Sequence, residues 1–150
     1  RAPRKPEDRI VHLLLMQPAW WDQLTAEDHD LLHTLPSPHA ELLGWLERDI
    51  VEHGPRPWAA VRTALAEDAV AAQALAALRL EDSEDFEAGP TELRLLLDGR
   101  VIAAIETRQR ELALAAATDP TALDEYRRTQ DRVRELKQRV EAALREASAA

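Results

Sequence analysis

The sequence contains no cysteine, only four glycines, and aromatic residues at just 4%. The absence of cysteine excludes disulfide bonds and thiolate metal sites. No stretch approaches 18 consecutive apolar residues, and the N-terminus lacks the apolar core of a signal peptide. The sequence therefore predicts neither a membrane-spanning helix nor a secreted protein, and we expect a soluble protein of the cytoplasm.

A length of 150 residues suits one compact domain, alone or with a small appendage. The chain begins at Arg1 rather than at methionine. We therefore expect it to be a piece of a longer protein or the product of tag cleavage.

The charge of the chain is strongly negative and unevenly distributed. The formal net charge is −9, whereas the segment from Asp119 to the end holds seven acids and seven bases. Residues 81–92 hold six acids and no base, and the first nine residues hold four bases. An acidic chain of this kind argues against general binding of nucleic acid, because neutralising phosphates requires clustered lysine and arginine. A small basic corner near the N-terminus is still compatible with the pattern.

The residues that are abundant, namely alanine, leucine, glutamate and arginine, favour helices, and no stretch shows the apolar alternation of a strand. We predict an all-α protein, with a multi-helix bundle followed by a C-terminal helical hairpin joined through a long helix. Prolines mark several helix starts, a capping box of Thr25 and Asp28 and an N-cap at Asp119 mark two more, and Gly54 marks a helix end. The expected helices cover 6–16, a short segment from Pro18, 25–32, 39–53, 58–67, 69–80, 90–117 and 120–147. The first of them is apolar over most of its circumference, which predicts a central buried helix.

The pattern predicts three parts: a flexible segment 1–6, a bundle subdomain 7–104 and a hairpin subdomain 105–150. The acidic segment 81–89 is expected to be a loop, and Gly99 is a plausible site for a kink in the long helix. The apolar stripe of the last helix is expected to consist of Leu123, Tyr126, Val133, Leu136, Val140 and Leu144. Two helices with single narrow apolar stripes bury little surface on their own. The hairpin therefore either projects toward a partner or packs back onto the bundle, and periodicity favours neither.

The segment HDLLH, residues 29–33, is the strongest candidate for a metal site. Its two histidines share one helix face, and it differs from the zinc-protease pattern H-E-x-x-H by aspartate in place of glutamate. A catalytic zinc needs a third protein ligand, and neither His39 nor His53 stands in a suitable position. The favoured interpretation is a structural one without metal: a surface helix with histidine near its C-terminus.

No other catalytic pattern is present: the sequence lacks a glycine-rich phosphate loop and a G-x-S-x-G turn. Trp20 and Trp21 are consecutive, so their side chains point about 100° apart on a helix. We expect one in the core and the other at a contact surface. The residues alone indicate no enzyme.

Two stretches together resemble a known family. RIVHLLLMQPAWWDQL, residues 9–24, is similar to the opening of the C-terminal helicase-binding domain of bacterial DNA primase (DnaG), where a helix R-I-x-x-L-L-x-x-x-P precedes a short proline-started helix. ELALAAAT (111–118) followed by LDEYRRTQDRVRELKQRV (123–140) resembles the terminal hairpin of that family. The order of helices also matches, so the resemblance extends along the chain.

The resemblance implies an interaction module that binds the hexameric replicative helicase (DnaB type) and couples primer synthesis to the replication fork in the bacterial cytoplasm. This fragment would have no catalytic residue, cofactor or metal, since the zinc-binding and polymerase domains of the parent enzyme, a nucleotidyltransferase, precede it. It would bind neither nucleic acid directly nor membranes. The family's helicase-binding face maps onto Leu112, Leu123, Tyr126, Arg127, Val133, Leu136 and Val140.

In the family, the bundle also binds the acidic C-terminal tail of single-stranded-DNA-binding protein in a basic pocket, which maps onto Arg9 and, more loosely, Lys5. Two rival functions stay open. The first is the N-terminal domain of the replicative helicase itself, although the glycine usual in its first helix is missing here. The second is a small zinc hydrolase that uses HDLLH.

Overall fold

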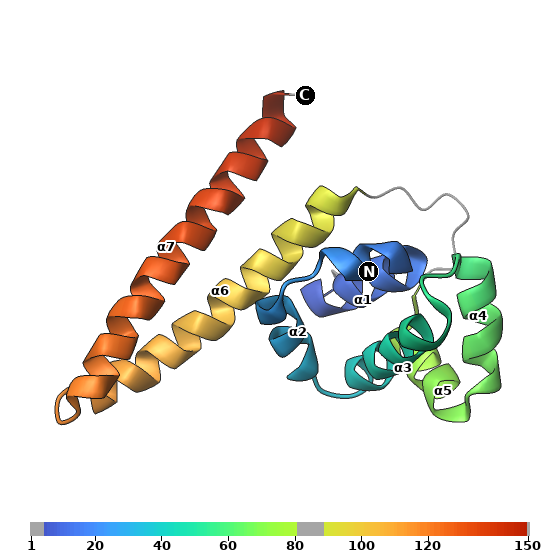
Figure 1. Cartoon of the computed structure of the whole chain (residues 1–150), viewed down its shortest axis with the longest axis horizontal. Helices are drawn as coiled ribbons and strands as arrows, with labels where there is room; N and C mark the ends of the chain where they lie inside the picture. The colour runs from blue at the N-terminus through green and yellow to red at the C-terminus, as the bar shows by residue number, and fades with distance from the viewer. Residues whose placement is uncertain (1–4, 81–88, 150) are drawn as a thin grey trace. The chain divides into compact units, whose positions relative to one another are not determined.

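The computed structural model of the chain describes residues 5–80 and 89–149, and every regular element within them is helical (Figure 1). The elements are α1 (Pro6–Met16), the 3-10 helix η1 (Pro18–Gln23), α2 (Ala26–His33), α3 (His39–His53), α4 (Trp58–Glu67), α5 (Ala69–Leu78), α6 (Pro90–Ala115) and α7 (Pro120–Ala149). The predicted all-α fold, with short helices, one long helix and a terminal helical pair, is confirmed.

Local signals explain most helix boundaries. Pro6 and Pro18 occupy the first turns of α1 and η1, where a missing N–H costs nothing. The Thr25 hydroxyl accepts the Asp28 N–H at 3.2 Å, and an Asp28 oxygen accepts the Thr25 N–H at 2.9 Å, which completes the predicted capping box of α2. Gly54 ends α3 with φ of 74°, a conformation that disfavours residues with a side chain.

The chain divides into two compact units, Arg1–Leu93 and Arg94–Ala150, so α6 begins in the first and continues in the second. The boundary predicted after residue 104 also falls within α6. Of the predicted flexible segment 1–6, residues 1–4 lie outside the described part, Lys5 precedes α1, and Pro6 begins it. The predicted acidic loop 81–89 lies, except for Gly89, outside the described residues.

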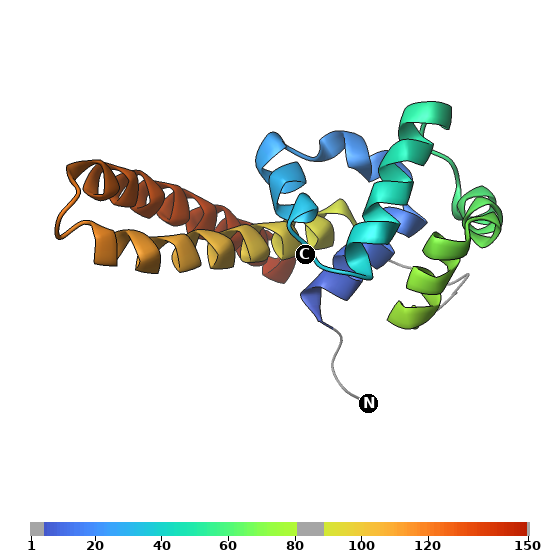
Figure 2. The ribbon, with the colours of Figure 1, turned by 90° about the horizontal axis from the view of Figure 1, so that it is seen from below.

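The core of the first unit is built around α1. Its residues Ile10, Val11, Leu13, Leu14 and Leu15 are at most 1% exposed, because α1 contacts η1, α3 and α4. In Figure 2, α1 crosses behind α3, and the α4–α5 pair lies beside both helices at the right of the view. The prediction of a central buried first helix is consistent with this packing.

In the second unit, α6 and α7 run antiparallel and are joined by the turn 116–119 (Figure 1). Helix α6 continues without a break through Gly99, the position where the sequence made a kink plausible.

Candidate functional site

The hairpin formed by α6 and α7 is the candidate functional site, because the residues expected from the resemblance to bind a helicase lie on it. Its turn is fixed by local bonds. The Asp119 N–H donates to the Ala115 carbonyl at 3.0 Å, and the Asp119 carboxylate accepts both the N–H of Thr121, at 2.9 Å, and its hydroxyl. These bonds, the Thr121 hydroxyl first, lower the pKa of Asp119 below its ordinary value. Asp119 thus begins α7 as an ionised cap, as predicted.

A narrow seam runs along α7. Its buried and half-buried positions repeat at alternating intervals of four and three residues, which is the spacing of a coiled coil. These positions are Ala122, Tyr126, Thr129, Val133, Leu136, Val140 and Ala143. On α6, half-buried or buried Ile105, Gln109 and Leu112 follow the same spacing.

Ion pairs between the two helices place these stripes face to face. Nε and Nη2 of the Arg108 guanidinium each lie 3.3 Å from a carboxylate oxygen of Glu125, and Nζ of Lys137 lies 3.7 Å from Glu106. All four side chains are 40–56% exposed, so each pair contributes little free energy, but the positions of the pairs show the register of the two helices. The second unit is therefore an antiparallel helical hairpin whose buried positions on α7 have the spacing of a coiled coil.

The helicase-binding residues expected from the resemblance fall into two groups. Leu112, Val133 and Leu136 are 1–8% exposed, and Tyr126 and Val140 are half-buried, so these five line the seam and close the hairpin. Leu123, at 38% exposed, and Arg127 lie on the outer surface. These last two are the members of the set that are largely open to a partner without opening the hairpin.

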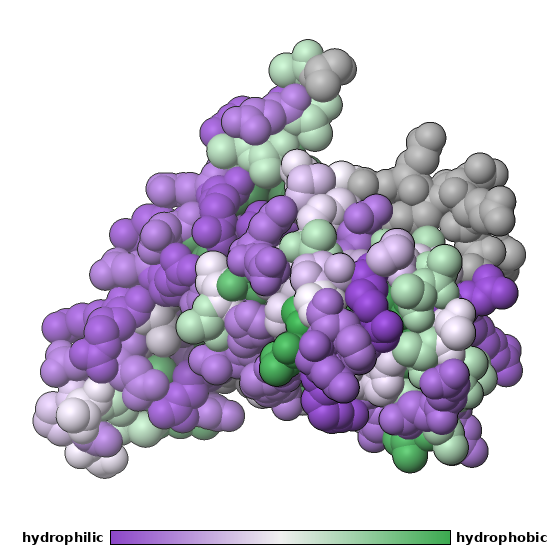
Figure 3. All heavy atoms as spheres, turned by 45° about the vertical axis from the view of Figure 1, so that its right-hand side comes forward, coloured by the Kyte–Doolittle hydropathy of each residue, from purple (hydrophilic) through white to green (hydrophobic). Residues whose placement is uncertain are grey.

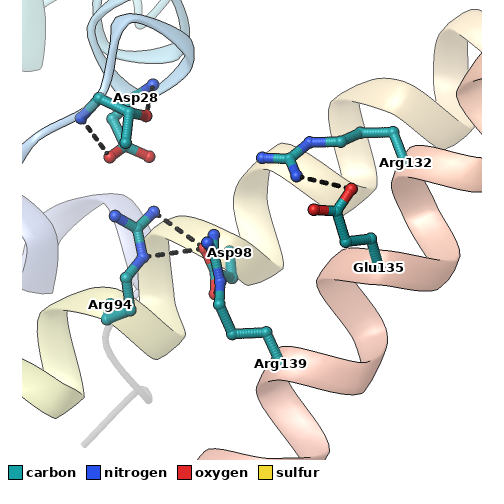
Figure 4. A network of polar contacts seen from close by, with 7 residues as sticks. Asp28, Arg94, Asp98, Arg132, Glu135 and Arg139 are labelled. Carbon is teal, nitrogen blue, oxygen red and sulfur yellow. Dashed lines mark hydrogen bonds and ion pairs between the residues drawn. The ribbon is translucent and has the colours of Figure 1, made fainter.

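Asp98 is the one fully buried charge in the described part of the second unit, at 0% exposed. Its carboxylate accepts the Arg94 Nε–H at 2.9 Å and the Nε–H and Nη2–H of Arg139 at 2.8 and 2.6 Å. Figure 4 shows Asp98 between the two guanidinium groups, with the separate Arg132–Glu135 pair of α7 farther along. Arg94 at i−4 was visible in the sequence as a pair with Asp98, whereas Arg139 lies 41 residues away.

The end of the hairpin differs from its shaft. We call residues 112–123 the hairpin tip: they include one charged residue, Asp119, whereas eleven of the 18 residues 124–141 are charged. Leu114 at the tip is 84% exposed. The small or apolar residues exposed with it at the tip are Ala113, Ala115, Ala117, Pro120 and Leu123. In Figure 3 the visible outer face of the hairpin is mostly hydrophilic, with pale and hydrophobic spheres at its lower end.

The two histidines of HDLLH have different surroundings in the structure. His33 is exposed and its Nε2 lies 3.4 Å from Glu47, while the ring of His29 lies 5.2 Å from that of Trp21 at 59°. The described residues contain no group of three or more His, Cys, Asp or Glu side chains arranged to hold a metal ion. The favoured interpretation, a surface helix, matches this geometry.

The residues expected to bind an acidic tail are placed differently from each other. Lys5 is exposed at the start of α1. Arg9 is half-buried and donates two hydrogen bonds to Glu92, from Nε at 2.6 Å and from Nη2 at 3.0 Å. An acidic peptide would therefore have to compete with Glu92 for the guanidinium of Arg9.

The paired tryptophans differ in exposure, which agrees in part with the expectation for them: Trp21 is buried, at 9% exposed, and Trp20 is half-buried. Trp21 packs near His29 within the first unit. Whether Trp20 meets a partner stays a prediction.

Among the described residues, no helix is both long and apolar enough to span a bilayer. Comparison of the chain with protein-family models, with curated proteins and with solved structures gives no match in any of the three. The hypothesis of a primase domain accordingly depends on the resemblance of the two stretches and on the arrangement of the helices.

Proposed function

We propose that the chain is a protein-interaction module, specifically the helicase-binding domain of a bacterial DNA primase, and that it docks on the replicative helicase through its hairpin tip. In this role the chain carries no catalytic step. It holds the polymerase domains of its parent protein at the fork by binding the helicase hexamer.

One observation carries the proposal: a leucine that is 84% exposed lies at the tip of the hairpin, where Asp119 is the one charged residue, whereas the rest of the hairpin is highly charged. Exposed apolar groups that are clustered rather than scattered mark sites of protein contact. Residues 124–141 of the hairpin have nearly equal numbers of acids and bases, so this part of the hairpin adds solubility without a strong attraction for phosphates. Leu114, Leu123 and the alanines between them give the tip an apolar contact surface of the kind that a helical partner buries.

The test is binding of the whole chain to the replicative helicase of the same organism, measured by co-elution in size-exclusion chromatography and by fluorescence anisotropy. Leu114→Asp should weaken binding at least tenfold, because it places a charge at the centre of the contact. Leu144→Asp is the matched control, since Leu144 is 51% exposed on the same hairpin but far along α7 from the tip. We expect it to bind within about twofold of the unmodified chain.

Two outcomes count against the proposal. If the unmodified chain does not co-elute with the helicase, the assignment to primase is wrong. If Leu114→Asp binds as tightly as Leu144→Asp, the hairpin tip is not the contact surface. Circular dichroism of both variants establishes that each is folded before the comparison is made.

The acidic tail of single-stranded-DNA-binding protein is a second proposed partner, at Arg9 and Lys5. The Arg9–Glu92 pair gives this proposal a sharp test, because removing the competing carboxylate should help the tail. Glu92→Gln is therefore expected to tighten binding of a tail peptide, and Arg9→Gln to weaken it. If neither substitution changes the affinity for the tail peptide, Arg9 does not bind the tail and only forms the ion pair with Glu92.

A further inference from the structure

A cavity of about 320 Å³ lies between α3 and the beginning of α5, wholly within the first unit. The two helices pack side by side there, as Figures 1 and 2 both show. A volume near the lower end of the range of binding clefts, roughly 300–1,000 Å³, leaves room for one or two amino-acid side chains. No residue of the hairpin lines this cavity, so a ligand bound in it is independent of the proposed function.

One wall of the cavity is apolar. It includes Trp45, which is 9% exposed, and Ala71, which is 2% exposed, whereas Val70 on the same wall is 62% exposed. A large apolar side chain that is left open beside a buried tryptophan favours an apolar group of a ligand over water.

Gly44 leaves this cavity open on the side of α3. A glycine inside a helix costs about 1 kcal/mol relative to alanine. An added Cβ at Gly44 would meet only Nη1 of Arg48, at 3.4 Å, among the described residues within 4 Å, and that atom is the end of a flexible side chain. The packing of the described part of the protein therefore does not require glycine here. A ligand that approaches the backbone of α3 closely would require it, because a Cβ would occupy the same space.

The cavity is acidic. Its lining contains the carboxylates of Glu41 and Asp68 and one cation, Arg48, in a chain whose net charge is −9. The Ser37 hydroxyl donates to Glu41 and is the main cause of a lowered pKa, so this carboxylate is ionised at neutral pH. Oδ1 of Asp68 accepts the Ala71 N–H at 3.0 Å and caps α5. Two negative charges beside one positive charge attract a cation.

Arg48 is exposed, and the structure shows it in no ion pair with the carboxylates of the described residues. Its planar group offers several N–H donors. A carbonyl oxygen of a peptide backbone satisfies such a donor without adding negative charge to an acidic cavity.

We infer that this cavity binds an extended peptide segment of a partner protein that presents an apolar side chain next to a lysine or arginine. The apolar side chain packs against Trp45 and Val70, and the cationic side chain faces Glu41 and Asp68. A backbone carbonyl of the peptide accepts a hydrogen bond from Arg48. The apolar wall selects the apolar side chain, and the two carboxylates select the cationic one. Gly44 leaves room for the peptide to approach α3.

The test uses two short blocked peptides, acetyl-Gly-Leu-Lys-Gly-amide and acetyl-Gly-Leu-Glu-Gly-amide, titrated into the whole ¹⁵N-labelled chain and followed by NMR. The lysine peptide should shift the amide resonance of Gly44 and the indole N–H of Trp45 in a saturable way. The glutamate peptide should bind at least tenfold more weakly. If neither peptide shifts these resonances, or if the glutamate peptide binds as well as the lysine peptide, the inference is wrong.

Matched variants separate binding from folding. Val70→Asp lies in the cavity wall and should abolish the saturable shifts, whereas Val51→Asp, at an 83% exposed position outside the cavity lining, should not change them. Asp68→Asn retains a side chain able to cap α5 while removing the charge, and should weaken the lysine peptide several-fold. Unchanged binding in both Val70→Asp and Asp68→Asn would overturn the inference.

Discussion

The carboxylate of Asp98 in α6 accepts two hydrogen bonds from the guanidinium of Arg139 in α7, at 2.8 and 2.6 Å. A bidentate pair of this kind fixes both the distance and the register between two helices. Because Asp98 is fully buried and Arg94 donates to the same carboxylate, the cluster also satisfies the only fully buried charge in the described part of this unit. The hairpin therefore has one well-defined polar lock in an otherwise narrow apolar seam.

The first prediction concerns this lock. Asp98→Asn removes the negative charge and leaves two arginines facing each other, so the free energy of unfolding should fall by about 2 kcal/mol. This is less than the 3–5 kcal/mol typical of a broken buried pair, because Arg94 and Arg139 are 28% and 45% exposed and water screens them. Urea unfolding followed by circular dichroism measures the change.

Arg134→Gln is the control for Asp98→Asn. Arg134 lies on α7, and its pair with Asp131 is long, at 3.6 Å, and about 70% exposed or more on both sides. Its loss should change stability by less than about 0.5 kcal/mol. Equal effects of the two substitutions would show that the buried position of Asp98 contributes nothing.

The second prediction concerns the capping box of α2. Thr25→Ala removes the hydroxyl that accepts the Asp28 N–H and should lower stability by about 1 kcal/mol. Thr25→Ser retains the hydroxyl and should recover most of the loss. A thermal unfolding series on the three proteins tests this, and an alanine variant as stable as the serine variant would contradict it.

The third prediction sets two glycines against each other. Gly99 is exposed in the middle of α6, and an added Cβ there would meet no heavy atom of the described residues within 4 Å. Gly99→Ala should therefore raise the free energy of unfolding by about 0.5–1 kcal/mol, because alanine favours the helix.

Gly54→Ala should do the opposite. Its φ of 74° lies in the left-handed region, which costs a residue with a side chain about 1–2 kcal/mol. The pair tests whether conformation or contact decides the effect, since an added Cβ at Gly54 also meets nothing within 4 Å among the described residues. Chemical denaturation of both variants gives the two signs, and the same sign for both would refute the argument.

The helices were predictable from the sequence because their ends are encoded locally. Pro6, Pro18, Thr25, Gly54 and Asp119 each act within a few residues of their own position, so the sequence contains the whole signal. The inward side of each helix was harder to predict. Leu123 and Leu144 were expected on the apolar stripe of the last helix, yet they are 38% and 51% exposed, while the smaller Ala122 occupies the seam.

The site was less predictable than the fold for the same reason. Leu114 stands two residues after buried Leu112, which rotates it by about 200° to the opposite face of α6. Which of the two leucines faces inward depends on where α7 lies, and that depends on contacts such as Asp98–Arg139 between distant residues. A single sequence shows residue spacing along one helix. It does not show that Asp98 pairs with Arg139, which lies 41 residues away.

The fourth prediction concerns acid pH and the hairpin turn. The Thr121 hydroxyl, and then its N–H, lower the pKa of Asp119 in the folded chain. A carboxyl group whose pKa is lower in the folded state contributes stability that is fully present above its unfolded pKa and is lost as the pH falls through the folded pKa. The turn should therefore keep its order at neutral pH and lose it below about pH 4.

Thr121→Val tests this dependence, because it removes the hydroxyl and leaves the backbone N–H in place. We expect the pKa of Asp119 to rise toward its ordinary value, so that order at the turn is lost at a higher pH than in the unmodified chain. The ¹³C resonance of the Asp119 carboxyl group, followed from about pH 2 to 6, reports the pKa directly. Thr129→Val is the control, since its hydroxyl donates to the Tyr126 carbonyl at 2.6 Å and to no carboxylate. A titration of Asp119 that is the same in all three proteins would show that the Thr121 hydroxyl does not stabilise the charged cap.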